Sequence, residues 1–387
     1  MDITQLLAFA MQNKASDVHL SASNPPVIRV SGQLKRLKAE PLTDEGIRQM
    51  IYSIMTEEQR AVFERDMEID YAIAFGEKAR FRVNAFHNRQ GAAAVLRSIP
   101  SVVPTMEQLD LPTILQRFAE LEKGIVLVTG PTGSGKSTTL AAMINHINEN
   151  LTKHILTIED PVEFYHTSKK SLVNHRELGT DTKSFPRALK SALREDPDVI
   201  LVGEMRDYET ISLALTAAET GHLVFGTLHS NSANKTIDRI IDVFPTGDKE
   251  MVRAMLSSSL QGVVSQTLLK RADGSGRVGA YEILVGTNAV RNLIRENKIS
   301  QIYSMMQTGL RYGMMTMEDA VQNLLTRNVI NEEESKRVLS KAEGDEEGEN
   351  YTRLEKNRRD KTVVKDVERT SDKQKAVGAT DDGGYAF

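Results

Sequence analysis

The chain has 387 residues, a formal net charge of -4 and no cysteine. This length exceeds that of most single domains, so we expect two folded units and a tail. A chain without cysteine forms no disulfides, thiolate zinc sites or cysteine nucleophiles, and the small negative charge provides no overall basic field for nucleic acid.

The opening residues 1–5 lack the cationic and apolar stretches of a signal peptide, and no window approaches the roughly 18 apolar residues that span a bilayer. We therefore expect a cytosolic protein without direct membrane insertion. At a membrane it would act through a partner that is embedded there.

The patterns in residues 1–99 predict a small α+β domain. Apolar residues recur at helical intervals over residues 3–11, and Thr56 with Gln59 three positions later has the spacing of a capping box that starts another helix. Strand-like patterns occur at residues 17–20, 27–30, 69–75, 80–86 and 93–99.

Three prolines, Pro100, Pro104 and Pro112, interrupt the next stretch, which has no sustained apolar period and is predicted to be a linker over residues 100–112. Short apolar strands then alternate with amphipathic segments, a pattern typical of a parallel α/β sheet. These strands are expected at residues 125–128, 155–158, 199–202 and 223–227.

Helical patterns dominate from residue 289 to about residue 342, including one that opens at Asn331 with three glutamates in its first turn. The second domain is therefore expected over residues 113–342. Residues 343–387 are dense in charge and have few aliphatic residues and no periodicity, so they are predicted to be a disordered charged tail.

A glycine-rich segment after the strand at 125–128 matches the phosphate-binding loop pattern, and a helical run follows it. Its backbone N–H groups would surround phosphates, Lys136 would contact the β- and γ-phosphates, and the Ser137 hydroxyl would bind Mg²⁺. The predicted site for a nucleoside triphosphate comprises Gly130, Pro131, Thr132, Gly133, Ser134, Gly135, Lys136, Ser137 and Thr138.

Two of the predicted strands end in carboxylates, and the carboxyl ends of strands form the ligand crevice of an open α/β sheet. Glu204 follows the strand at 199–202 and is the candidate for holding the water shell of Mg²⁺, whereas Glu163 is the candidate for polarising the attacking water. Glu159 and Asp160 lie in the same acidic segment as Glu163, and a role as ordinary helix-start or surface acids is open for both.

Two histidines, His222 and His229, bracket the strand at 223–227. In an extended strand they lie roughly 23 Å apart and cannot share a metal. His229 falls at the carboxyl end of the strand, where an imidazole could sense the γ-phosphate. His222 falls at the opposite end, where a structural and a functional role are both open.

The strand at 80–86 alternates strictly, which puts Arg80 and Arg82 on one face and Phe81 and Val83 on the other. An exposed arginine pair is usually a solvated sheet surface, but in a multi-subunit NTPase such side chains can reach a neighbour's nucleotide. Arg97, in the strand at 93–99, is a third candidate for this role.

The order of the phosphate loop, the acidic segment 159–163, Gly203-Glu204 and the histidine segment 221–229 resembles that of the secretion ATPase superfamily. Within it, residues 289–296 resemble the short helical motif of the type IV pilus retraction ATPases, with Val290 where that family usually has Ile. The resemblance extends from residue 1 to about residue 341. The assembly ATPases usually carry an extra N-terminal domain and a four-cysteine zinc motif, and the absence of both here favours retraction.

The resemblance implies a PAS-like N-terminal domain joined to a RecA-like P-loop ATPase domain with a helical C-terminal part. It implies a homohexamer that hydrolyses Mg-ATP at subunit boundaries and powers pilus retraction and twitching motility. The partners that it implies are an inner-membrane pilus platform protein, which recruits the enzyme to the inner face of the cytoplasmic membrane, and an accessory retraction ATPase.

The resemblance also implies roles for single residues. Glu163 corresponds to the catalytic carboxylate, Glu204 to the magnesium-side carboxylate and His229 to a phosphate sensor. The arginines delivered from the N-terminal domain would be Arg80, Arg82 and Arg97.

Three alternative interpretations are open. The long charged tail resembles that of the accessory paralogue of the retraction ATPase, although that paralogue usually lacks the motif at 289–296. A nucleic-acid translocase on the same core would bind single strands with a steep salt dependence, and we expect no nucleic-acid partner. A nucleotide-gated adaptor would bind ATP with little turnover, so it would lose little activity in Glu163→Gln.

Overall fold

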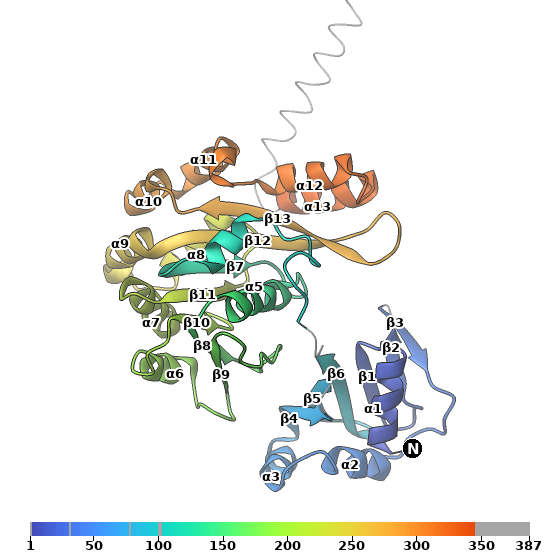
Figure 1. Ribbon diagram of the computed structural model, residues 1–387. Coiled ribbons are helices and arrows are strands. Elements are labelled where there is room, and N and C mark those ends of the chain that lie inside the picture. Colours follow the sequence, from blue (N-terminus) through green and yellow to red (C-terminus); the bar gives the residue numbers. More distant parts are fainter. Residues whose placement is uncertain (1, 31, 77–78, 100–102, 345–387) are drawn as a thin grey trace, which may run out of the picture. The chain divides into compact units, whose positions relative to one another are not determined.

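The computed structural model describes residues 2–30, 32–76, 79–99 and 103–344 (Figure 1). Residues 100–102 of the predicted linker and residues 345–387 of the predicted tail lie outside the described residues. The chain divides into two compact units, Met1–Leu268 with Gly279–Thr316 and Leu269–Val278 with Met317–Phe387. The first unit holds two separate sheets.

The first sheet has six strands in the order β3-β2-β1-β6-β5-β4, and each strand is antiparallel to its neighbours (Figure 1). Its strands are β1 (Asp17–Ser21), β2 (Val27–Val30), β3 (Gln33–Arg36), β4 (Glu68–Phe75), β5 (Ala79–Asn88) and β6 (Gly91–Ile99). Three helices add apolar side chains to its core: α1 (Ile3–Gln12), α2 (Asp44–Tyr52) and α3 (Glu57–Asp66). The five predicted strands and two predicted helices are confirmed, whereas β3 and α2 were not predicted.

Side-chain caps determine where these three helices begin, and at the start of α2 the Thr43 hydroxyl accepts from the Gly46 N–H at 3.1 Å. Asp2 accepts a hydrogen bond from the Thr4 N–H at 2.7 Å at the start of α1. The capping box predicted for α3 is confirmed, because the Thr56 hydroxyl accepts from the Gln59 N–H at 3.2 Å and the Gln59 side chain accepts from the Thr56 N–H at 2.9 Å. These bonds satisfy N–H groups that have no partner within the helix.

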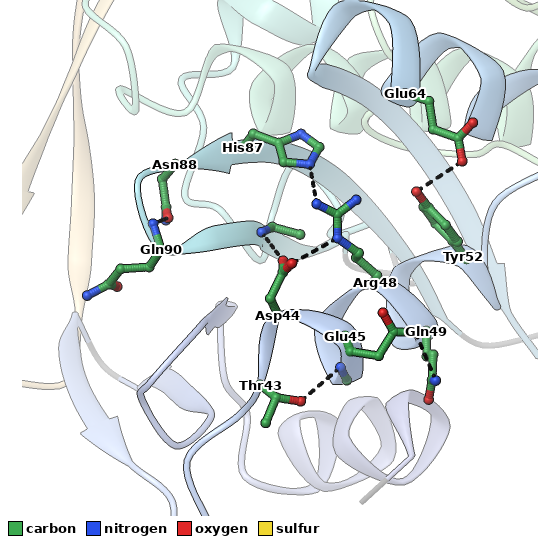
Figure 2. Close-up of polar contacts among 12 residues, drawn as sticks. Thr43, Asp44, Glu45, Arg48, Gln49, Tyr52, Glu64, His87, Asn88 and Gln90 are labelled. Atoms are coloured by element: carbon green, nitrogen blue, oxygen red, sulfur yellow. Dashed lines mark hydrogen bonds and ion pairs between the residues drawn. The ribbon is translucent and has the colours of Figure 1, made fainter.

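A polar cluster joins α2 to the hairpin of β5 and β6 (Figure 2). The Asp44 carboxylate accepts from the Ala92 N–H at 2.6 Å and from the Arg48 Nε at 3.0 Å, and the other end of the Arg48 guanidinium lies 3.0 Å from the His87 Nε2. A β-carbon on Gly91, whose φ is +123°, would lie 2.3 Å from the Asp44 carboxylate. The hairpin therefore needs glycine at this position.

The alternation predicted for the strand at 80–86 is confirmed in β5. Phe81 and Val83 are fully buried in the core beneath the helices, while Arg80 and Arg82 are half-buried on the opposite face. The N-terminal sheet thus has one apolar face and one face that carries charged side chains.

The second sheet has seven strands in the order β13-β12-β7-β11-β10-β8-β9, and the six from β12 to β9 run parallel (Figure 1). Its strands are β7 (Gly124–Thr129), β8 (His154–Glu159), β9 (Leu172–Glu177), β10 (Val199–Val202), β11 (Leu223–Leu228), β12 (Leu260–Lys270) and β13 (Arg277–Val285). The four predicted strands are confirmed as β7, β8, β10 and β11. The remaining three were not predicted.

Both faces of the second sheet are buried. Alternate residues of the central strands enter two different cores, with Leu127 and Val224 in one and Val126 and Phe225 in the other. The first core includes α6 (Phe185–Ala192), α7 (Tyr208–Glu219), α8 (Ala233–Asp242), α9 (Lys249–Ser259) and α10 (Asn288–Arg295), and the second includes α4 (Ile114–Ala119) and α5 (Lys136–Asn150). Burial on both faces accounts for the continuous apolar runs in the sequence.

Helices dominate from residue 288 to residue 344, as predicted for residues 289–342. The segment at 289–296 lies on α10, where Val290 and Ile294 face the core. Further helices are α11 (Ile302–Gln307), α12 (Met317–Thr326) and α13 (Glu332–Gly344). In the second unit the Glu334 carboxylate accepts from the Lys270 N–H at 2.8 Å and pairs with Arg337 at 2.6 Å.

No helix within the described ranges combines the length and the apolar character that a bilayer crossing requires. The fold class is the one predicted: an α+β domain followed by a P-loop α/β domain with C-terminal helices.

Candidate active site

The predicted phosphate loop lies between β7 and α5. The loop leaves the fully buried β7 at Thr129, and α5 begins after Gly135 without a side-chain cap. Its first N–H groups are therefore available to an anion, and the helix dipole favours negative charge at this end. A β-carbon on Gly130, whose φ is +141°, would lie 2.3 Å from the Gln266 carbonyl oxygen, so the loop can follow this path only with glycine there.

The Lys136 ammonium is the cation of this loop. Its Nζ donates to the Gly130 and Pro131 carbonyl oxygens at 2.9 and 3.2 Å. Burial lowers the pKa of Lys136, while the charges of Glu204 and Glu163 act to raise it. Two carboxylates from different loops thus lie close enough to Lys136 to influence its charge.

Gln266 on β12 is a site residue that the sequence analysis missed. Its Nε2 donates to the Ser134 carbonyl oxygen at 2.8 Å, and both residues are almost fully buried. Within the described part of the chain, the buried Ser134 hydroxyl has no hydrogen-bond partner. An unpaired hydroxyl beside an uncapped helix start fits a phosphate group well. No local motif marks Gln266, because it reaches the loop through the pairing of β12 with β7.

Glu204 follows β10 and lies next to His229, which follows β11. The His229 Nε2 is 3.2 Å from the Glu204 Oε1, and the same carboxylate pairs with the Arg206 guanidinium at 2.6 Å. Burial works to raise the pKa of Glu204, but the bond and charge of Arg206, together with His229 and Lys136, hold it below its usual value. Glu204 is therefore ionised at neutral pH. Arg206 was not predicted.

The backbone of His229 is held by α8. The Arg239 guanidinium donates to the His229 carbonyl oxygen at 2.6 Å. Burial and the nearby Lys136 lower the pKa of the His229 imidazole, and Glu204 acts in the opposite direction. The ring is consequently neutral at physiological pH, which leaves one nitrogen as an acceptor and one as a donor.

The acidic segment that follows β8 places its carboxylates in different environments. Burial raises the pKa of Glu159 to about 7, and the carboxyl group accepts from the Glu163 N–H at 3.4 Å. The Glu163 carboxylate is near enough to Lys136 to act on its pKa, and the Asp160 charge acts on Arg206. Glu159 is thus a buried support of the segment, while the charge of Glu163 acts on the cation of the phosphate loop.

The two histidines lie at opposite ends of β11, as predicted. His222 is near the start of the strand, where its ring Nδ1 lies 2.9 Å from the Ala217 carbonyl oxygen and its own carbonyl accepts from the Gly124 N–H at 3.0 Å. These contacts join the end of α7 to β7. Its position is remote from the phosphate loop, and its contacts are structural.

The three predicted arginines lie on the charged face of the N-terminal sheet. Arg82 and Arg97 are directly opposite each other in the β5–β6 ladder, and Arg80 lies two residues before Arg82. The Arg97 side chain is 69% exposed, yet its Nε donates to the nearly buried Asp17 carboxylate at 2.9 Å. Asp17, which the sequence analysis did not single out, therefore fixes the direction of an exposed guanidinium.

The residues also fit a magnesium ion bound together with a nucleotide. Ser137 lies in the first turn of α5 and Glu204 at the end of β10, so both are at the same edge of the sheet. A hydroxyl and an ionised carboxylate are the oxygen ligands that Mg²⁺ takes along with phosphate and water.

Comparison with known proteins agrees with this architecture. The type II/IV secretion system protein family matches residues 1–369. The chain is 57% identical over 336 residues to the type IV pilus retraction ATPase PilT of Pseudomonas aeruginosa, covering 87% of this chain and 97% of that protein. It is 58% identical over 318 residues to a twitching motility protein of Neisseria gonorrhoeae, covering 82% and 85% of the two chains.

A solved structure extends the similarity to three dimensions. The crystal structure of the pilus retraction motor PilT with bound ADP superposes with a TM-score of 0.82 at 48% identity, covering 87% of this chain and 97% of that chain. The N-terminal domain and the P-loop domain thus occur together in a known ATPase fold.

Proposed function

The chain belongs to the type II/IV secretion system protein family and is an ATP hydrolase, and from this premise we propose that it is a magnesium-dependent, homohexameric motor that powers type IV pilus retraction. The observation that supports hydrolysis most directly is that the charges of Glu204 and Glu163 both act on Lys136 of the phosphate loop. The names of the two relatives from Pseudomonas aeruginosa and Neisseria gonorrhoeae support retraction as the process that the motor drives.

ATP would bind with its β- and γ-phosphates at the start of α5. Lys136 would exchange its carbonyl partners in the loop for phosphate oxygens, and the uncapped N–H groups of α5 would donate to the phosphates. Ser137 and Glu204 would hold Mg²⁺, the latter partly through water, and the ion would supply charge neutralisation for the leaving phosphate.

Hydrolysis requires a base for the attacking water and a group that senses the γ-phosphate. Glu163 would polarise the water, because its charge is near enough to act on Lys136 of the phosphate loop. The neutral His229, which contacts Glu204, would donate one ring N–H to the γ-phosphate and change partners when the phosphate leaves.

The charged face of the N-terminal sheet would complete a neighbouring subunit's site. Arg80, Arg82 and Arg97 lie on that face, and guanidinium groups stabilise the charge of a transferring phosphoryl group. ATP binding would close the boundary between two subunits, and hydrolysis would reopen it. If the six boundaries of the ring close one after another, they would turn a partner that is seated in the centre. That partner would be the inner-membrane pilus platform protein, which would recruit the cytoplasmic motor to the membrane.

The deciding experiment measures Mg-ATP turnover and solution mass together for the wild type and Glu163→Gln. We expect a six-subunit wild type that hydrolyses ATP and a variant of the same mass whose kcat is lower by about 100-fold or more. Expression of each form in a piliated bacterium that lacks its own retraction ATPase then reports on twitching motility. A monomer without turnover, or a fully active Glu163→Gln, would contradict the motor; turnover without restored motility would contradict retraction alone.

A further inference from the structure

The edge strand β9 carries a buried histidine that no step of the proposed mechanism uses. His175 is paired with Thr157 across the β8–β9 ladder, and its Nδ1 lies 2.8 Å from the Thr157 hydroxyl. The Tyr165 ring stacks on His175 with a centroid separation of 4.6 Å. Burial lowers the pKa of His175, so the ring is neutral and carries a single proton.

The contacts of His175 determine which ring nitrogen carries this proton. The His166 backbone N–H, which can only donate, points at the His175 Nε2 at 3.0 Å. Nε2 is therefore the acceptor, and the proton lies on Nδ1, from which it is donated to the Thr157 hydroxyl. The His166 carbonyl oxygen, 3.3 Å from Nε2, would suit the opposite tautomer, but that tautomer would leave the His166 N–H without its acceptor.

A defined tautomer at His175 also fixes the direction of the Thr157 hydroxyl. Because Thr157 accepts from His175, its own proton is free to be donated. The Glu159 Oε1 lies 4.0 Å from the His175 Nδ1, and burial raises the pKa of Glu159 while the Thr157 hydroxyl acts to lower it. Glu159 in turn accepts from the Glu163 N–H at 3.4 Å. Glu159 is thus an acceptor for the backbone of Glu163, and these contacts connect the β9 edge with the acidic segment.

We propose that His175 and Thr157 are positioning residues that orient the Glu159 carboxyl group so that it holds the backbone of Glu163, and with it the Glu163 carboxylate, against the nucleotide. This inference rests on the proposed role of Glu163 as the group that polarises water. A buried carboxyl group without oriented donors would turn to other partners, because an unsatisfied polar group in the interior is costly. A displacement of the Glu163 carboxylate by about 1 Å is sufficient to reduce turnover strongly.

The experiment compares Thr157→Val, which keeps the shape of the side chain and removes its proton, with Thr157→Ser, which keeps the hydroxyl. We expect kcat for ATP to fall about tenfold or more in Thr157→Val, with KM within about twofold of the wild type, because the phosphate loop is untouched. Thr157→Ser should recover most of kcat. His175→Asn, whose amide can donate from the position of Nδ1, should keep more activity than His175→Leu.

A matched control is Thr216→Val on α7. Among the residues that the structure describes, the Thr216 hydroxyl donates to the Ser212 carbonyl oxygen alone, at 2.8 Å, and it lies in no site described above. Thr216→Val should keep the wild-type kcat. It thereby shows how much the loss of a partly buried hydroxyl by itself changes kcat. Should Thr157→Val not fold, Thr157→Ser and the two His175 variants decide the matter by the same kcat and KM comparison.

Failure of this inference differs from failure of the proposed function. An active Glu163→Gln would remove the role of Glu163 itself, whatever the Thr157 variants do. If Glu163→Gln is inactive while Thr157→Val keeps the wild-type kcat, or while Thr157→Ser is as impaired as Thr157→Val, then the bonds from His175 through Thr157 do not position Glu163.

Discussion

The two sheets of this protein place their functional side chains in different ways. In the N-terminal sheet the candidate residues stand on one face, where β5 alternates between a core residue and an arginine. In the parallel sheet both faces are buried, and the candidates lie in loops at the carboxyl edge, beyond the ends of β7, β8, β10 and β11. An antiparallel sheet with one solvated face can present side chains to a partner from that face. A parallel sheet that is covered on both faces can present them only from the loops at the ends of its strands.

The strongest test of the carboxyl-edge site is Lys136→Ala. Loss of the cation that contacts the phosphates should reduce ATP turnover on the order of 1000-fold, measured as phosphate release at saturating Mg-ATP. A suitable control is Lys190→Ala on α6, because the exposed Lys190 pairs with Glu209 at 2.6 Å and is remote in the sequence from every loop of the site. Turnover close to that of the control would show that the loop is not the phosphate site.

The corresponding test of the charged face is Arg97→Ala. If this face completes a neighbour's site, turnover should fall about 100-fold or more while the solution mass stays that of the wild type. Arg65→Ala is the matched control in the same domain, since Arg65 is exposed and pairs with its neighbour Asp66. Full activity in Arg97→Ala would mean that Arg97 has no part in a neighbour's nucleotide site. The residues needed for ATP turnover would then be those at the carboxyl edge of the parallel sheet.

A third prediction concerns the stability of the N-terminal sheet. Gly91→Ala should lower the free energy of unfolding by about 2 kcal/mol, because the added methyl group meets the Asp44 carboxylate and the backbone has a positive φ. Gly32→Ala separates these causes, since Gly32 also has a positive φ but nothing within 4 Å of the added carbon. Denaturant titration of both variants gives the difference, and equal losses would mean that the contact with Asp44 has no effect.

The domain of the parallel sheet is expected to respond to pH through His166, a buried residue in the segment between β8 and β9. Burial, and to a smaller degree His175 and Lys169, lower the pKa of His166 to about 3. Between that value and the ordinary value near 6.5 only the unfolded chain binds the proton, so the free energy of unfolding should fall as the pH falls through this range, by about 1.4 kcal/mol per pH unit for one group. In His166→Gln the dependence of the free energy of unfolding on pH should lose the contribution of one bound proton. An unchanged dependence would mean that another group titrates in this range.

The sequence predicted those parts of the molecule that depend on local patterns. The phosphate loop, the capping box at Thr56 and the alternation at Arg82 each lie within a few residues of chain, and the structure has each where it was predicted. The roles given to the site residues are still predictions.

The sequence did not predict contacts between residues that are distant along the chain. Gln266 reaches the loop because β12 pairs with β7, and Asp17 holds Arg97 because β1 pairs with β6. The edge strand β9 has two apolar residues followed by four polar or charged ones, so it lacks the continuous apolar run of the central strands and its pairing with β8 was not predicted. Arg206 lies beside Glu204 in a loop that has no periodic signal of its own.

The register between β5 and β6 also limits how this domain can vary during evolution. Arg82 lies opposite Arg97, and each shares its face with a partner carboxylate, Asp70 or Asp17. A one-residue insertion within either strand would turn every later side chain to the other face and bring a charge into the core. Insertions and deletions in descendants of this sequence should therefore occur in the connection between β3 and α2. The β5–β6 hairpin should keep its length.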